Sequence, residues 1–229
     1  MKFKLENQIY YCNDFENDVE VLFIMESPFA EELDEGFPCM GNSGIEMSKA
    51  LKLGDEALGE LLLNRREKRF AIFETFNFAL DTRVCANFAL EDICKFWDVC
   101  DLPWCGLKIQ DKSIGNELKI KRRGAYDRNA HYESLWDYIF CIDANVRNAF
   151  FEKYANILNP IIKKEKFPNI KEIVVCGFIA QSVFTVAFEK KVFPYNTPLS
   201  IKNCSVPVRF LNHPSGSLHN HQEWSYSLL

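Results

Sequence analysis

Three polar side chains, Glu26, Asn77 and His213, come shortly after apolar segments that are rich in β-branched and aromatic residues. Such segments are typical of buried strands. If these strands are parallel, their carboxyl ends meet at one edge of the sheet, where open α/β sheets bind ligands. The carboxylate can orient or deprotonate water, the amide can read a planar base, and the imidazole can stabilise a developing anion. These residues therefore predict a shared catalytic crevice.

Two of these residues also have structural interpretations. Asn77 can instead cap a turn, because asparagine side chains often bond to neighbouring backbone groups. His213 is one of only four histidines, and its place at a strand end beside Pro214 favours a functional role over filling the core. A nucleophilic triad is not indicated, because no serine or cysteine lies in an elbow motif. Neither a phosphate-binding loop nor a dinucleotide fingerprint occurs in the sequence.

The elements that must position these side chains are apolar segments separated by turn residues. Four segments are expected to form the central strands: 20–24, 69–73, 171–176 and 206–211. The third continues through Gly177 into a helix that runs to about Glu189, as in a parallel βα unit. The expected fold is therefore a single-domain, three-layer α/β/α structure with a central, mostly parallel four-stranded sheet.

The remaining elements are expected to cover this sheet. Residues 9–12 form either a short helix or an edge strand, and a helix begins near Ser43 with a break near Gly54. Apolar residues three and four apart predict a long helix over about 129–158, which Asn159 and Pro160 should end or kink.

The composition fits one domain that spans residues 1–229, with 48% hydrophobic and 26% charged residues. The 20 phenylalanines indicate an aromatic core more readily than base-stacking surfaces. No signal peptide and no long apolar run is evident, so we expect a cytoplasmic protein with no membrane partner. With a net charge of -5, the protein has no overall electrostatic field that would attract it to nucleic acid. Any DNA contact must come from a local patch.

The densest positive cluster lies in residues 108–128, a basic segment that we expect to be a surface excursion. It contains Lys119, Lys121, Arg122 and Arg123. Such a run is usually a solvated face or hairpin. In an acidic chain it is also the best candidate for contacts to phosphate, and Lys121 and Arg122 are the residues expected to make them.

Taken together, four motifs make the chain resemble the uracil-DNA glycosylase superfamily, and most closely its bacterial and archaeal iron-sulfur type. That family has a G-E-x-P-G motif, a G-x-P-F-V-G-x-x-G motif, a strand that ends in L-G-x-x-A, and a late H-P-S motif. The corresponding stretches occur here in the same order: 25–29, 36–44, 176–180 and 213–215. The resemblance therefore covers the chain from about residue 20 to residue 218.

The chain departs from the family pattern at several positions. Met25 and Phe29 replace motif glycines, and Cys39 replaces the aromatic residue that stacks on uracil in the family. The paired amino-terminal cysteines that hold the cluster are reduced to Cys12, so the iron-sulfur cluster is expected to be absent. The residues after Pro28, through Gly44, are expected to form a loop whose glycines let its backbone come close to a bound group. This loop also carries acidic residues that would repel phosphate: Glu31, Glu32, Asp34 and Glu35.

The resemblance implies hydrolysis of the N-glycosidic bond of uracil or another deaminated base in single- or double-stranded DNA, by a monomer without a cofactor. It implies catalysis by Glu26 and His213, and base contacts by Asn77, Phe29, Phe37 and Cys39. It also implies contacts to DNA through the turn that contains Ser215, Gly216, Ser217 and Leu218. Two alternatives remain: a degenerate module that binds nucleic acid or nucleotide without cleavage, and a small-molecule hydrolase or transferase on a similar sheet.

The nine cysteines predict a protein without bound metal. Their odd number and irregular spacing indicate reduced thiols, and no C-x-x-C pair occurs among Cys85, Cys94, Cys100 and Cys105. The alternative for these four is a zinc or iron-sulfur site. The purified protein should be colourless, and metal analysis should find no stoichiometric iron or zinc. A brown protein with one cluster per chain would overturn this prediction.

Overall fold

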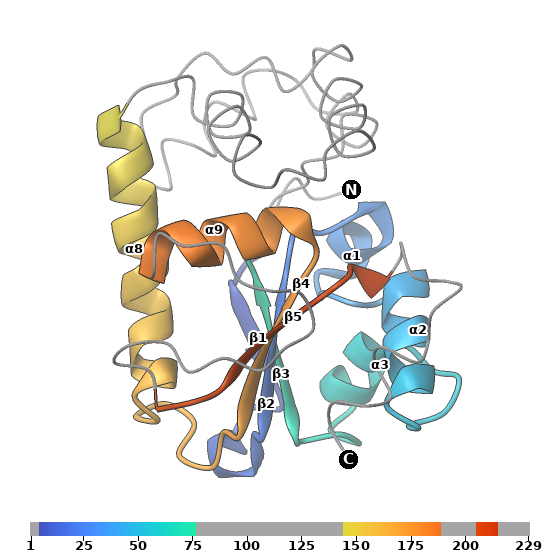
Figure 1. Ribbon diagram of the computed structural model, residues 1–229. Helices are drawn as coiled ribbons and strands as arrows, with labels where there is room; N and C mark the ends of the chain where they lie inside the picture. The colour runs from blue at the N-terminus through green and yellow to red at the C-terminus, as the bar shows by residue number, and fades with distance from the viewer. Residues whose placement is uncertain (1–4, 77–143, 189–204, 215–229) are drawn as a thin grey trace.

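The computed structural model describes residues 5–76, 144–188 and 205–214 (Figure 1). Within these ranges the chain forms a mixed α/β structure around one five-stranded sheet with the order β1-β3-β2-β4-β5. The strands are β1 (Ile9–Tyr11), β2 (Val21–Met25), β3 (Phe70–Glu74), β4 (Glu172–Cys176) and β5 (Val208–Leu211).

Four of these strands are parallel, as the sequence predicted. β2 pairs with β3 on one side and with β4 on the other, and β4 pairs with β5, in each case in parallel. The fifth strand, β1, pairs with β3 in the antiparallel direction. The sheet therefore has one strand more than expected, because residues 9–11 adopt the edge strand, one of the two alternatives for this region.

Helices cover the sheet on both sides. They are α1 (Ala30–Glu35), α2 (Asn42–Ala50), α3 (Leu58–Leu63), α8 (Ala144–Ile162) and α9 (Phe178–Phe188), with a 3₁₀ turn, η1, over Glu16–Asp18. In Figure 1, α8 lies on one side of the strands and α2 and α3 on the other. Every residue of β2, β3 and β4 is buried, as expected for strands with both faces covered.

Two helices differ from the sequence-based expectation. α1 was expected to be loop, but Glu32 caps its first turn and Gly36, at φ 75°, ends it in the left-handed conformation. α8 continues past Pro160 to Ile162. Leu158 and Ile161 are fully buried on either side of Pro160. The stabilisation from their packing therefore outweighs the loss of the one backbone hydrogen bond that proline cannot donate. The expected beginning of this helix, near residue 129, lies outside the described residues.

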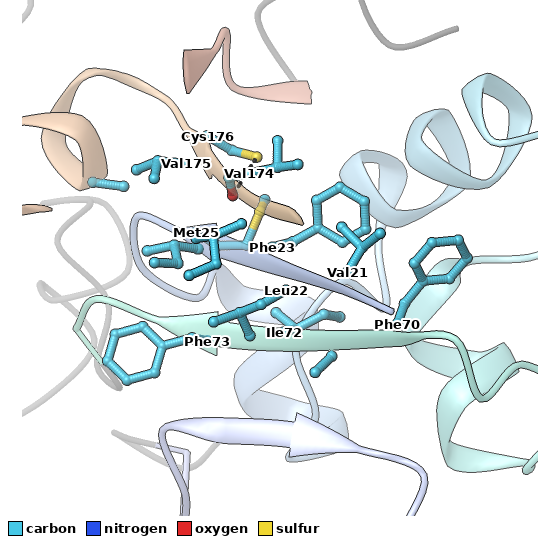
Figure 2. Packing of buried hydrophobic residues seen from close by; sticks show 14 of the residues in the cluster. Val21, Leu22, Phe23, Met25, Phe70, Ile72, Phe73, Val174, Val175 and Cys176 are labelled. Carbon is cyan, nitrogen blue, oxygen red and sulfur yellow. Dashed lines mark hydrogen bonds between the residues drawn. The ribbon is translucent and has the colours of Figure 1, made fainter. Parts of the chain in front are cut away.

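The core is rich in aromatic rings, as the phenylalanine content indicated. Phe73 of β3 meets Tyr154 of α8 edge to face, with ring centroids 5.3 Å apart. Phe76, just after β3, stacks on Phe150 of α8 at 5.2 Å. Figure 2 shows the apolar side chains of β2 packed among those of β3 and β4, including Phe23. These contacts fix α8 against the sheet.

The loop between α1 and α2 packs closely on neighbouring backbone. A Cβ atom at Gly44 would lie 1.8 Å from the Cys39 carbonyl oxygen, and one at Gly59 would lie 2.2 Å from the Pro38 carbonyl oxygen. Gly59 N also donates a 2.9 Å hydrogen bond to Cys39 O. The sequence predicted that this glycine-rich loop brings its backbone close to a bound group. In the described structure, Gly44 brings α2 close to the loop's own backbone, and the approach to a bound group stays a prediction.

Several sequence-based expectations fall outside the described residues, including the basic segment 108–128 and the cysteines between residues 83 and 105. Among the helices that are described, none has both the length and the apolar character needed to cross a membrane.

The packing at Gly44 predicts a large effect of a single methyl group. Gly44→Ala should lower the free energy of unfolding by about 1–3 kcal/mol, because a backbone carbonyl cannot move aside as a side chain can. Chemical denaturation measures this difference. Gly41→Ser is the control, because its Cβ would meet only the flexible Glu31 carboxylate, at 3.1 Å, and serine suits the start of α2. Equal stability of the two variants would contradict the packing argument.

Candidate functional site

The parallel strands deliver two of the predicted site residues to one edge of the sheet. Glu26 directly follows β2, and His213 comes two residues after β5. Because β2, β4 and β5 run in the same direction, both residues lie at the carboxyl edge, separated by the end of β4. Asn77, the third predicted residue, lies three positions after β3 and outside the described residues.

Gly177, which follows β4, provides the space for the Glu26 side chain. It has φ 88°, and a Cβ at this position would lie 2.5 Å from Glu26 Oε1. Its N–H donates to Leu211 O at 2.9 Å, and its carbonyl accepts from Gln181 N at 3.0 Å. The turn after β4 therefore leaves room for the Glu26 carboxyl group beside the strand end that separates it from β5.

Gln181 is a residue of this edge that sequence reasoning did not identify. Its Nε2 donates to Leu211 O at 2.6 Å and to Val175 O at 3.3 Å, so it ties the first turns of α9 to the ends of β4 and β5. It is buried, and such a polar side chain needs partners inside the protein. Its position four residues after Gly177, in a mostly apolar helix, was the available signal.

Glu74 places a second carboxyl group at the same edge. It is the last residue of β3 and lies beside Met25 of β2 in the sheet register. Its side chain is buried, and its Oε2 has no hydrogen-bond partner in the described structure. Burial, then the charges of Glu32 and Glu26, raise the pKa of Glu74 well above its ordinary value. Burial therefore favours the neutral form of Glu74.

Glu32 adds a third carboxyl group, and it is one of the four acidic loop residues that were expected to repel phosphate. Glu31, Asp34 and Glu35 are exposed, but Glu32 is 8% exposed. Its Oε2 accepts from Phe29 N and its Oε1 from Cys39 N, both at 2.6 Å. Burial raises the pKa of Glu32 to about 7, although these two hydrogen bonds act in the opposite direction.

The three predicted base-contacting residues of this loop have different environments. Cys39 is fully buried, and its thiol contacts Met47 Sδ at 3.7 Å. The prediction that Cys39 contacts a base therefore does not fit this packing, because its side chain belongs to the core. Phe37 is partly buried edge to face against Tyr10, with centroids 4.9 Å apart. Phe29 is 38% exposed and is the ring most available to a ligand.

The described residues give partial information on metals. Cys12, Cys39 and Cys176 are free and buried. Within the described ranges, no group of three or more histidine, cysteine, aspartate or glutamate side chains is arranged to hold a metal ion. The other cysteines singled out in the sequence lie outside those ranges, so the expectation of a metal-free protein stays a prediction.

The candidate DNA-contacting residues Lys121, Arg122, Ser215, Gly216, Ser217 and Leu218 also lie outside the described residues. What the described edge offers chemically is a partly exposed carboxylate, Glu26, beside two buried carboxyl groups, with His213 beyond the neighbouring strand end. Such an edge can orient water through Glu26 and donate a hydrogen bond from an imidazole.

No protein-family model matches the chain, and no curated protein matches it.

The contact between Glu26 and Gly177 can be tested by a double-mutant cycle. Gly177→Ala should lower the free energy of unfolding for two reasons: the left-handed conformation costs roughly 1–2 kcal/mol with a Cβ, and the new methyl group displaces Glu26 at a further cost of about 1 kcal/mol or more. In a Glu26→Ala background only the first cost remains. Chemical denaturation of the four proteins gives the coupling, and a coupling energy near zero would contradict the contact.

Proposed function

We propose that the chain is a DNA glycosylase-like hydrolase that removes uracil or another deaminated base, on a three-layer α/β/α fold of the uracil-DNA glycosylase type. The observation that carries this proposal is the shared carboxyl edge, where Glu26 lies against Gly177 and His213 follows the next strand, β5. A carboxylate and an imidazole on separate strand ends suit a reaction in which water attacks one end of a bond and charge develops at the other. The helices on both sides of the sheet are compatible with the proposed layers.

In the proposed reaction the target base leaves the base stack and enters the site. The bond between C1′ of the sugar and the base nitrogen breaks, and its electron pair departs with the base. His213 donates a hydrogen bond that stabilises the resulting anion. Glu26 orients a water molecule towards the oxocarbenium-like sugar; the hydroxyl group adds to C1′, and the proton passes to the carboxylate or to the departing base.

The remaining roles concern recognition. Asn77 would read the edge of the base, and Phe29 would supply the stacking surface that Cys39 does not offer. Stacking of a base on an aromatic ring is worth about 1–3 kcal/mol, so the exposure of Phe29 matters for affinity. Lys121, Arg122 and the turn at 215–218 would contact the DNA backbone.

The alternative function is a module that binds nucleic acid or nucleotide without cleavage. The exposed acidic residues Glu31, Asp34 and Glu35 favour this alternative. They lie on α1, which begins directly after Phe29, and their charges would oppose the approach of phosphates. The core position of Cys39 points in the same direction, since an aromatic residue is missing there.

The sharpest test is His213→Ala in single-turnover excision from uracil-containing single- and double-stranded oligonucleotides. Excision should slow about a hundredfold to a thousandfold, the usual effect of removing a preorganised donor, while affinity changes only a few fold. Lys171→Ala is the control: Lys171 is exposed, pairs with Glu20 at 2.6 Å and precedes β4, at the opposite edge of the sheet. This variant should excise at the wild-type rate.

Binding measurements on the same oligonucleotides separate the two functions. Lys121→Ala combined with Arg122→Ala should weaken binding and flatten its salt dependence without slowing the single-turnover step at saturation. Equal excision by wild type and His213→Ala would exclude the proposed mechanism. Measurable binding without excision of any deaminated base would favour the non-catalytic module.

A further inference from the structure

The segment 29–39, called here the edge segment, is joined at both ends by one buried side chain. Glu32 lies within it and accepts the N–H of Phe29 at one end and the N–H of Cys39 at the other, both at 2.6 Å. These two hydrogen bonds satisfy backbone donors at both ends of the segment with one side chain. Within the described structure, Glu32 therefore closes the segment into a compact loop at the carboxyl edge.

The two ends of the edge segment are held differently. Cys39 has φ 55°, a strained conformation for a residue with a side chain, and its carbonyl accepts from Gly59 N while its thiol lies in the core. At the other end, Phe29 is 38% exposed, and α1 begins directly after this residue. Glu32 therefore transmits the fixed position of Cys39 to the exposed ring of Phe29.

Glu74 lies close enough to Glu32 for their charges to interact, and no lysine or arginine among the described residues shifts the pKa of either carboxyl group. The titratable groups that act on one or both are Tyr10 of β1, Glu26 after β2, Glu31 of α1, Cys39 of the edge segment and Cys176 of β4. All of them are acids that are neutral or negative. Glu74 also has an oxygen without a hydrogen-bond partner in the described structure.

These surroundings determine how the closed segment responds to pH. The pKa of Glu32 rises from the ordinary 4.5 to about 7 in the closed loop, and the pKa of Glu74 is also raised. An opening that hydrates these groups returns their pKa values towards ordinary ones. The closed state is therefore favoured most below about pH 4.5, and for Glu32 this advantage is lost as the pH rises to about 7.

We propose that Glu32 is the positioning residue of the edge segment and that the segment is closed most tightly when the buried pair Glu32 and Glu74 is uncharged, so that negative charge on this pair releases Phe29 from the sheet edge. The closure itself is independent of any substrate. That Phe29 is thereby positioned for a flipped base rests on the proposed function.

Amide hydrogen exchange of peptides within residues 29–41 tests the proposal on the whole free protein. After correction for the intrinsic exchange rate, protection should fall on the order of tenfold to a hundredfold between pH 5 and pH 8. Glu74→Gln, which keeps the shape but cannot ionise, should reduce this fall. Glu35→Gln is the matched control, since Glu35 is an exposed residue of α1, and it should behave as wild type.

Glu32→Gln should lose protection at both pH values, because its amide presents a donor to one of the two N–H groups; the expected loss is about tenfold or more. If this variant does not fold, the comparison of wild type with Glu74→Gln decides. Protection that does not depend on pH in wild type, or that falls equally in wild type and Glu74→Gln, would overturn the proposal.

The test also separates this proposal from the glycosylase proposal. A pH-dependent segment in a protein that excises no base would leave the role of Glu32 in place and remove the glycosylase. Excision together with pH-independent protection would do the reverse. In an active enzyme, Glu32→Gln should raise KM for the oligonucleotide more than it lowers kcat, because Glu32 acts through Phe29 and does not touch the reacting atoms.

Discussion

The parallel pairing of β2 with both β3 and β4 is the constraint on which the candidate site depends. Backbone hydrogen bonds on both edges of β2 fix its register, so that Met25 lies beside Glu74 and Ile24 beside Val175. Because parallel strands end on the same side, each side chain that follows a strand is delivered to one edge. The position of Glu26 is thus a consequence of backbone geometry.

The convergence of three carboxyl groups at this edge has an electrostatic cost, because two of them are shielded from water. Glu74 and Glu32 are buried, and isolated buried carboxylates are expensive. The structure meets the cost in two ways: Glu32 accepts two backbone N–H groups, and burial raises the pKa of Glu74, which favours its neutral form. Glu26 is only partly buried, so it is the carboxylate of the three that a ligand can reach.

The loop after β2 shows how packing redistributes roles among neighbouring residues. Cys39 lies at the position where the resemblance implies a stacking aromatic, yet its side chain points to Met47 in the core. Its backbone carbonyl accepts a hydrogen bond from Gly59 N, and its backbone N–H donates one to Glu32. The exposed aromatic surface belongs instead to Phe29, at a position where the family motif has glycine. In the proposed function, recognition at this edge therefore depends on Phe29, a residue at which the chain departs from the family motif.

The sequence by itself determined the four parallel strands and their boundaries to within two residues, because a short apolar run closed by Gly, Pro or polar residues is a local signal. It also identified Glu26 and His213 as residues at strand ends for that reason. Only the tertiary structure decided that Glu32 and Glu74 are buried together and that Cys39 belongs to the core. Burial depends on what packs against a side chain from distant parts of the chain, and no local pattern contains that information.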